Sequence, residues 1–206
     1  MPRVCLLLML LLTVPSLAQI GGKKRDPYEK IKTQAQADEV GKEVVADLNK
    51  LFGMRLTKPV DLHLVDPKVM DAKFASSPYK GAEIGLYTGI ENGRHQVWVM
   101  EGWSRDVCQG VTAHELTHAW QTENDLNHQD QALIEGLAMW IEQRYYDHLG
   151  AYQLAENVRD TADPVYGVGI KALLALEDKV GALKVLTEVR KVQTAQQLLP
   201  KDTKKR

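Results

Sequence analysis

The chain of 206 residues has only two cysteines, no repeated segment and no excess of charge of either sign. Its 26 lysine and arginine residues nearly balance 27 aspartate and glutamate residues, which argues against nucleic acid or an anionic membrane as a partner recognised by charge. The apolar fraction of 44% and the charged fraction of 26% are those of an ordinary soluble globule. This length favours one domain with a buried core.

The only long apolar run lies at the N-terminus and has the parts of an export signal. Arg3 gives a positive start, and residues 4–14 are apolar but too few to span a bilayer. Small residues precede Ala18, after which we expect cleavage. We therefore predict a signal peptide over 1–18, a flexible lead over 19–25, and a secreted or periplasmic protein without a stable membrane anchor. An uncleaved anchor or a buried N-terminal helix is the alternative.

The two cysteines agree with export without disulfides. Cys5 leaves with the signal, so Cys108 remains alone and no intrachain bridge can form. A lone thiol is usually a small buried apolar group, and we expect this of Cys108. A nucleophilic role would require a nearby histidine as its base.

A first helix is predicted over 26–51. Asp26 and Pro27 form a start signal, because aspartate caps helices and proline is tolerated at the first helical position. Apolar residues then recur at helical spacing up to Leu51. Gly53 follows as the expected stop.

A small antiparallel sheet and several helices are expected after this first helix. The predicted strands are 60–65, ended by Asp66-Pro67, then 84–90 and 96–100. Asn92-Gly93 is the strongest short hairpin signal and joins the last two strands. The predicted helices are 106–123, 129–149, 151–160, 165–178 and 180–189. Strands followed by helices indicate an α+β fold, with one domain over 26–195 and a basic tail over 196–206.

One predicted helix contains the stretch GVTAHELTHAWQ, residues 110–121. Residues four apart share a helix face, so His114 and His118 can hold one metal ion. Glu115 lies about 100° around the helix, where it can reach a water on the metal without being a ligand in line. Two ligands and a general base are what a zinc hydrolase needs. The alternative is an ordinary helix with solvated or carboxylate-paired histidines.

A third ligand is needed, because catalytic zinc usually takes three protein ligands. After the polar turn 122–127, a second helix capped by Asn127 is expected to pack beside the first. Glu135 lies about two turns into it among apolar residues, where a carboxylate needs a partner. Gly136 allows helices to approach closely at this point. Glu135 is therefore favoured over Glu142, which is expected to hydrogen-bond a ligating residue or to face solvent.

The other histidines are expected to have no ligand role. His95 and His148 have no partner at metal-binding spacing, and His63 lies on the polar face of its strand. His128, in the turn, is an alternative ligand, but a loop histidine is more often solvated.

In these features the chain resembles the gluzincin clan of zinc peptidases. It is similar to the C-terminal peptidase domain of the plant organ-size-regulating, LIM-domain-containing, ubiquitin-activated peptidases and to its small bacterial relatives. The matching pieces, within about residues 80–195, are Gly85-Leu86-x-x-Gly89, His114-Glu115-x-x-His118-Ala119-Trp120, Glu135-Gly136 and Pro164-Val165-Tyr166-Gly167-x-Gly169. The sequence has neither LIM modules nor a recognisable ubiquitin-interacting helix, so control by ubiquitin is not expected.

The resemblance implies a metallopeptidase that acts on a peptide or protein substrate. It implies one Zn²⁺ per chain, held by His114, His118 and Glu135, with Glu115 as the general base. It also draws attention to Tyr166, which could donate to the oxyanion of the tetrahedral intermediate. The other interpretation of Tyr166 is a tyrosine that closes a turn.

The resemblance also implies a place for the substrate, and two other functions stay open. The strand 96–100 is expected to form the upper edge of a cleft and to pair with an extended peptide. A zinc-binding but non-catalytic interaction module is one alternative, although the intact Glu115 argues against it. A metal-free helical protein with an accidental pattern is the other.

Overall fold

The computed structural model describes residues 26–74 and 84–200. The predicted signal peptide, its cleavage site, the flexible lead and the end of the basic tail lie outside these ranges. The helices are α1 (Gln34–Phe52), α2 (Pro67–Phe74), α3 (Arg105–Glu123), α4 (Gln131–Leu149), α5 (Tyr152–Arg159), α6 (Tyr166–Val180) and α7 (Ala182–Glu188), followed by the short 3-10 turns η1 (Val189–Lys191) and η2 (Ala195–Gln197). The strands are β1 (Val60–Val65), β2 (Gly85–Glu91) and β3 (Arg94–Met100). In the described ranges, no helix combines the length and apolar character that crossing a bilayer requires.

The predicted α+β fold is confirmed, and the predicted strands and the five predicted helices after them end within two residues of the observed bounds. The first helix begins later than the Asp26-Pro27 signal predicts. Thr33 caps it: its hydroxyl accepts from the backbone N–H of Gln36 at 3.3 Å, and the Gln36 side chain accepts from the N–H of Thr33 at 3.0 Å. Asp26 only closes a turn before it. The helix ends at Gly53 as predicted, with a φ of 68° that suits glycine.

Two other helix starts differ from prediction because aspartates cap them. Asp66-Pro67 predicts only a strand end, but Oδ1 of Asp66 accepts two backbone N–H groups of the following turn, at 2.8 and 3.1 Å, and α2 begins there. α4 is capped by Asp130 rather than Asn127, and Oδ1 of Asp130 accepts from the N–H of Leu133 at 2.8 Å.

The sheet is mixed rather than antiparallel throughout. β2 and β3 form the antiparallel hairpin that Asn92-Gly93 predicts, and both turn residues have the positive φ that such a turn requires, 51° and 75°. β1, however, pairs in parallel with β3, which gives the strand order β1-β3-β2. The expectation that 96–100 forms the edge of a cleft is therefore wrong, because β3 is hydrogen-bonded on both sides. In the described part of the chain, β2 is the edge strand that lies over α3.

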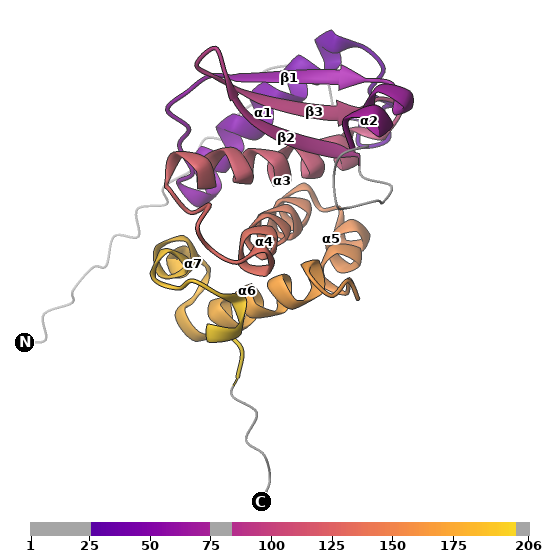
Figure 1. Cartoon of the computed structure of the whole chain (residues 1–206). Coiled ribbons are helices and arrows are strands. Elements are labelled where there is room, and N and C mark those ends of the chain that lie inside the picture. Colours follow the sequence, from indigo (N-terminus) through magenta and orange to yellow (C-terminus); the bar gives the residue numbers. More distant parts are fainter. Residues whose placement is uncertain (1–25, 75–83, 201–206) are drawn as a thin grey trace, which may run out of the picture.

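Helix α3 lies in the middle of the molecule and is buried on most sides. Figure 1 shows the sheet and α1 above it, α4 beneath it, and α6 beneath α4. The largest fully buried side chains of this core include Leu116, Leu133, Leu137, Trp140, Ile141 and Leu173. Because polar side chains are costly to bury without partners, the histidines and glutamate of α3 must meet partners from the elements around them.

Two glycines let α4 and α6 cross at close range. A Cβ atom on Gly136 would overlap the backbone of Gly169, and a Cβ atom on Gly169 would overlap the carbonyl of Ala132. The close approach predicted for Gly136 is therefore present, but its partner is α6 rather than α3. This crossing brings the start of α6, with Tyr166, to the edge of the space between α3 and β2.

Candidate metal centre

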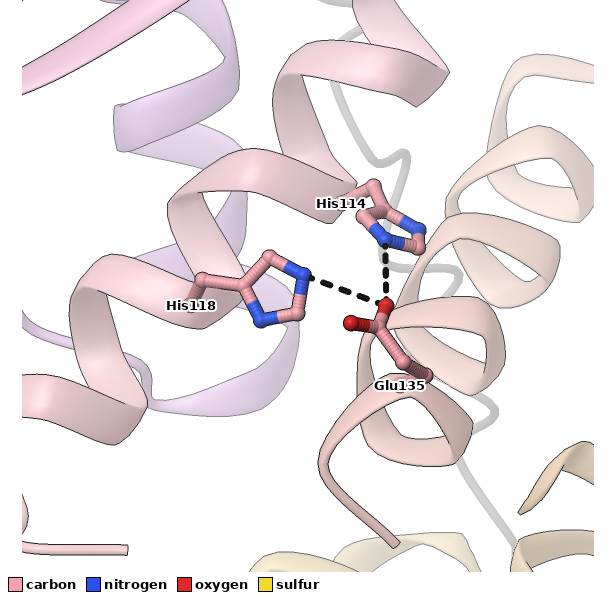
Figure 2. A group of neighbouring side chains, drawn as sticks. All are labelled: His114, His118 and Glu135. Carbon is pink, nitrogen blue, oxygen red and sulfur yellow. Dashed lines mark ion pairs between the residues drawn. The ribbon is translucent and has the colours of Figure 1, made fainter. Parts of the chain in front are cut away.

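Three polar side chains from α3 and α4 converge on one point. His114 and His118 lie one turn apart on α3, and Glu135 reaches them from α4 (Figure 2). Oε2 of Glu135 lies 3.4 Å from Nε2 of His114 and 3.4 Å from Nε2 of His118. Over residues 26–74 and 84–200, this is the one group of three such side chains whose ligand atoms all lie within 4.8 Å of one another. It is a candidate site for one metal ion, made of the three residues predicted as ligands.

The two distances from Glu135 to the histidines fit a shared ion better than direct hydrogen bonds. An N–H···O hydrogen bond normally joins atoms about 2.7–3.2 Å apart, which is shorter than the 3.4 Å observed. In a tetrahedral zinc site, metal–ligand distances of about 2.0–2.1 Å place two ligand atoms about 3.3–3.4 Å from each other. Two imidazoles and one carboxylate are also a donor set found in catalytic zinc sites.

Glu142 determines which nitrogen of His114 faces the site. Its Oε2 lies 3.0 Å from Nδ1 of His114, and a carboxylate can only accept, so Nδ1 bears the proton. Nε2 of His114 therefore directs a lone pair toward Glu135. Glu142 thus has one of its two predicted roles, as a partner that orients a histidine of the group.

Gln121 does the same for His118, and sequence patterns do not single it out. Its Nε2 donates to the carbonyl of Ile134 at 2.8 Å, so its Oε1 must face Nδ1 of His118, which lies 2.8 Å away. Nδ1 of His118 is then the donor, and its Nε2 lone pair faces the site. The same amide ties α3 to the residue that precedes Glu135. A glutamine three residues after a histidine is too common to signal this role.

Two imidazole lone pairs and a carboxylate that face one another need a positive charge between them. Burial opposes a charged imidazole, but the neighbouring carboxylates of Glu135 and Glu142 raise the pKa of His114 well above its ordinary value. Burial alone would raise the pKa of Glu135, but the neighbouring imidazoles of His114 and His118 lower it well below its usual range. The site therefore favours a cation at its centre, whether a proton or a metal ion.

Glu115 lies beside this group and faces the same cavity. The side chain is nearly buried, with 8% of the residue exposed, and burial raises the pKa of its carboxyl above the ordinary value although His114 and His118 oppose the shift. Its carboxylate packs against β2, where a Cβ atom on Gly85 would come within 2.7 Å of Oε1. Only glycine at position 85 lets the strand pass this close to Glu115.

A cavity of about 450 Å³ opens along the three converging residues. Its walls are β2, α3, the start of α4 and Tyr166, and a second hollow of about 240 Å³ continues past Glu115 to Glu142 and Tyr146. Tyr166 borders both hollows, on a turn in which Oδ1 of Asp163 accepts its backbone N–H at 2.9 Å. Its placement agrees with either interpretation, so its role as an oxyanion donor stays a prediction.

The remaining candidates from the sequence lie apart from the group. Cys108 is buried as predicted, and burial raises the pKa of its thiol to about 12, which disfavours a nucleophilic thiolate. His128 is exposed and contacts Gln193 at 3.3 Å, so it is not the alternative ligand. His148 is exposed, and His95 is buried against other partners.

Comparisons with known proteins leave the interpretation of this site to its geometry. No family model, no curated protein and no solved structure matches the chain. The α+β fold and a His-Glu-x-x-His helix that meets a glutamate of the next helix are present in the structure.

Proposed function

We propose that this protein is a zinc-dependent peptidase of the gluzincin type. The observation that carries the proposal is the convergence of His114, His118 and Glu135, in which Oε2 of the glutamate lies 3.4 Å from Nε2 of each histidine, with the carboxylate of Glu115 facing the same cavity. Three protein ligands leave one position of a tetrahedral zinc ion for water, which is the arrangement of a catalytic rather than a purely structural site.

Hydrolysis requires a new bond from water oxygen to the scissile carbonyl carbon and cleavage of the carbon–nitrogen bond. A zinc ion held by His114, His118 and Glu135 would polarise the carbonyl and lower the pKa of water in the site. Glu115 accepts the proton of the attacking water and delivers it to the leaving amine. Burial raises the pKa of this carboxyl, which makes its carboxylate a better proton acceptor. Tyr166 donates to the oxyanion of the tetrahedral intermediate.

The edge strand β2 provides the place for an extended substrate. Gly85, Leu86 and Tyr87 line the cavity, and within the described residues this strand is paired only with β3. A peptide that adds to its free edge by backbone hydrogen bonds passes over the α3 residues that face the cavity. β2 thus takes the role that the sequence assigned to 96–100.

The proposal is tested with a quenched peptide library, in the presence of zinc and of a chelator. We expect wild-type protein to cleave with zinc and to lose activity with chelator. The Glu115→Gln variant should bind one zinc ion per chain and lose activity by about 10²–10⁴-fold, the usual contribution of a general base. The control is Glu101→Gln, which changes an exposed glutamate outside the cavity.

Each other result contradicts part of the proposal. Cleavage by Glu115→Gln at the wild-type rate would refute the role of Glu115 as the base. Zinc binding by wild-type protein without any cleavage would favour a non-catalytic interaction module. Wild-type protein that binds no zinc after loading would refute the metal site itself.

A further inference from the structure

The two oxygens of the Glu135 carboxylate have different partners. Oε2 faces both imidazoles, at 3.4 Å from each Nε2. Oε1 lies 2.6 Å from Nε2 of Gln131. Because the carboxylate can only accept, the Gln131 amide must present its N–H group to it.

Gln131 is held where it can do this. It is the first residue of α4 and lies one turn before Glu135, on the same helix face. The start of α4 is fixed by its cap Asp130, whose carboxylate accepts from the N–H of Leu133 at 2.8 Å and from the N–H of Ala195 at 3.2 Å. The Gln131 side chain itself is exposed and lines the cavity, so the folded core does not depend on it.

We propose that Gln131 is a positioning residue that keeps Glu135 a ligand through one oxygen, an inference that rests on the zinc site proposed above. A carboxylate can bind a metal through one oxygen or through both. Binding through both would add a fifth ligand atom beside the two imidazoles and the water that a catalytic zinc site keeps. The hydrogen bond from Gln131 opposes this, since it holds Oε1 at the amide and competes with the ion for that oxygen.

The test uses Co²⁺ in place of zinc, because its visible absorption reports coordination number. Four-coordinate Co²⁺ absorbs more strongly than five- or six-coordinate Co²⁺, since a tetrahedral site lacks a centre of symmetry. Gln131→Met removes the amide but keeps an unbranched side chain. Gln131→Lys keeps a nitrogen donor on a side chain of similar reach. The matched control is Gln153→Met, because Gln153 also lies early in a helix and contacts the residue four positions on, Asn157, at 3.3 Å.

We expect Gln131→Met to weaken the visible absorption several-fold and to weaken Co²⁺ affinity by about 10-fold, as loss of a ligand's hydrogen-bond partner usually does. Gln131→Lys should restore the strong absorption, and Gln153→Met should match the wild type. Equal spectra and equal affinities for wild type and Gln131→Met would overturn the inference.

The outcome separates this inference from the proposed activity. Wild-type protein with the strong four-coordinate spectrum but without peptide cleavage would refute the peptidase and still support the role of Gln131. Full cleavage by wild type together with an unchanged spectrum in Gln131→Met would refute only the role of Gln131. Wild-type protein that binds no Co²⁺ would overturn both.

Discussion

Helix α3 contributes to two histidine–glutamate clusters that differ in how completely the protein satisfies them. At the end of the helix, Glu123 accepts from Nε2 of His95 at 2.9 Å, while the hydroxyl of Tyr87 contacts Nδ1 of His95 at 2.9 Å. Both nitrogens of this fully buried ring thus have protein partners at hydrogen-bonding distance. In the middle of the helix, His114 and His118 have such a partner at Nδ1 only.

The difference shows how to tell a structural histidine from a candidate ligand. Glu123 also accepts the backbone N–H groups of Thr57 and Lys58, at 2.6 and 2.8 Å, and so joins α3 to the loop before β1 and to β3. This cluster needs no bound ion, because both ring nitrogens of His95 already have protein partners. At the other cluster, two lone pairs face one carboxylate oxygen at a distance that suits an intervening ion. Both clusters pair histidine with glutamate, and the satisfaction of the ring nitrogens distinguishes the structural histidine from the candidate ligands.

The largest effect should come from removing one glutamate from each cluster in turn. Glu135→Ala should weaken zinc affinity by more than about 100-fold, because it removes a ligand and not only a ligand's partner. Glu123→Ala should leave zinc affinity unchanged. Competition with a chromophoric chelator measures both affinities. Equal affinities in the two variants would show that the mid-helix cluster is not a metal site.

The cluster of His95 and Glu123 should make the stability of the fold depend on pH. Burial opposes ionisation, but the hydrogen bonds from His95, Thr57 and Lys58 lower the pKa of Glu123 to about 2 from the ordinary 4.5. A lowered pKa in the folded state means stability that is present above the unfolded value of 4.5 and lost as the pH falls toward 2. Two to three pKa units correspond to about 3 kcal/mol.

Glu123→Gln should therefore lower the free energy of unfolding by about 3 kcal/mol near neutral pH. The difference from wild type should shrink as the pH falls from 4.5 to about 2, where the wild-type carboxyl is itself protonated. Urea unfolding at a series of pH values measures this difference. A difference that is constant across the window would show that the charge of Glu123 contributes nothing.

The smallest effect should come from replacing Gln121, the hydrogen-bond partner of His118. Gln121→Ala removes the acceptor for Nδ1 of His118 and should weaken zinc affinity by about 10-fold. Gln121→Glu keeps an acceptor for His118 but sets a carboxylate against the carbonyl of Ile134, so it should recover part of the affinity and lower stability. Zinc affinity and thermal unfolding of the two variants test this. Similar affinity in Gln121→Ala and wild type would show that His118 needs no partner.

Local patterns predicted much of this molecule because they depend on neighbours in the chain. His114 and His118 share a face through helix geometry alone, and Glu135 is marked by the apolar residues around it in the sequence. The hairpin follows from Asn92-Gly93, whose two residues tolerate the positive φ of the turn. Helix starts were predicted less well where several side chains competed for the cap, as at Asp26 and Thr33.

The contacts that complete the site could not be predicted in this way, because their partners are distant in the sequence. Gln121 meets the carbonyl of Ile134 only after α3 and α4 have packed. The edge position of β2 depends on β1 pairing in parallel with β3, across a connection that contains another helix and strand. The need for glycine at position 85 arises only because the folded strand packs against Glu115.

The sequence by itself determined the α+β order of elements, the two histidines on one helix face and the glutamate that could join them, since periodicity and spacing act within a few turns of the chain. Only the tertiary structure decided which ring nitrogens face the cavity, which strand borders it and which histidine has protein partners at both ring nitrogens. Hydrogen-bond partners 28 residues apart along the chain, such as His114 with Glu142 and His95 with Glu123, are chosen by packing, and packing follows from the whole core.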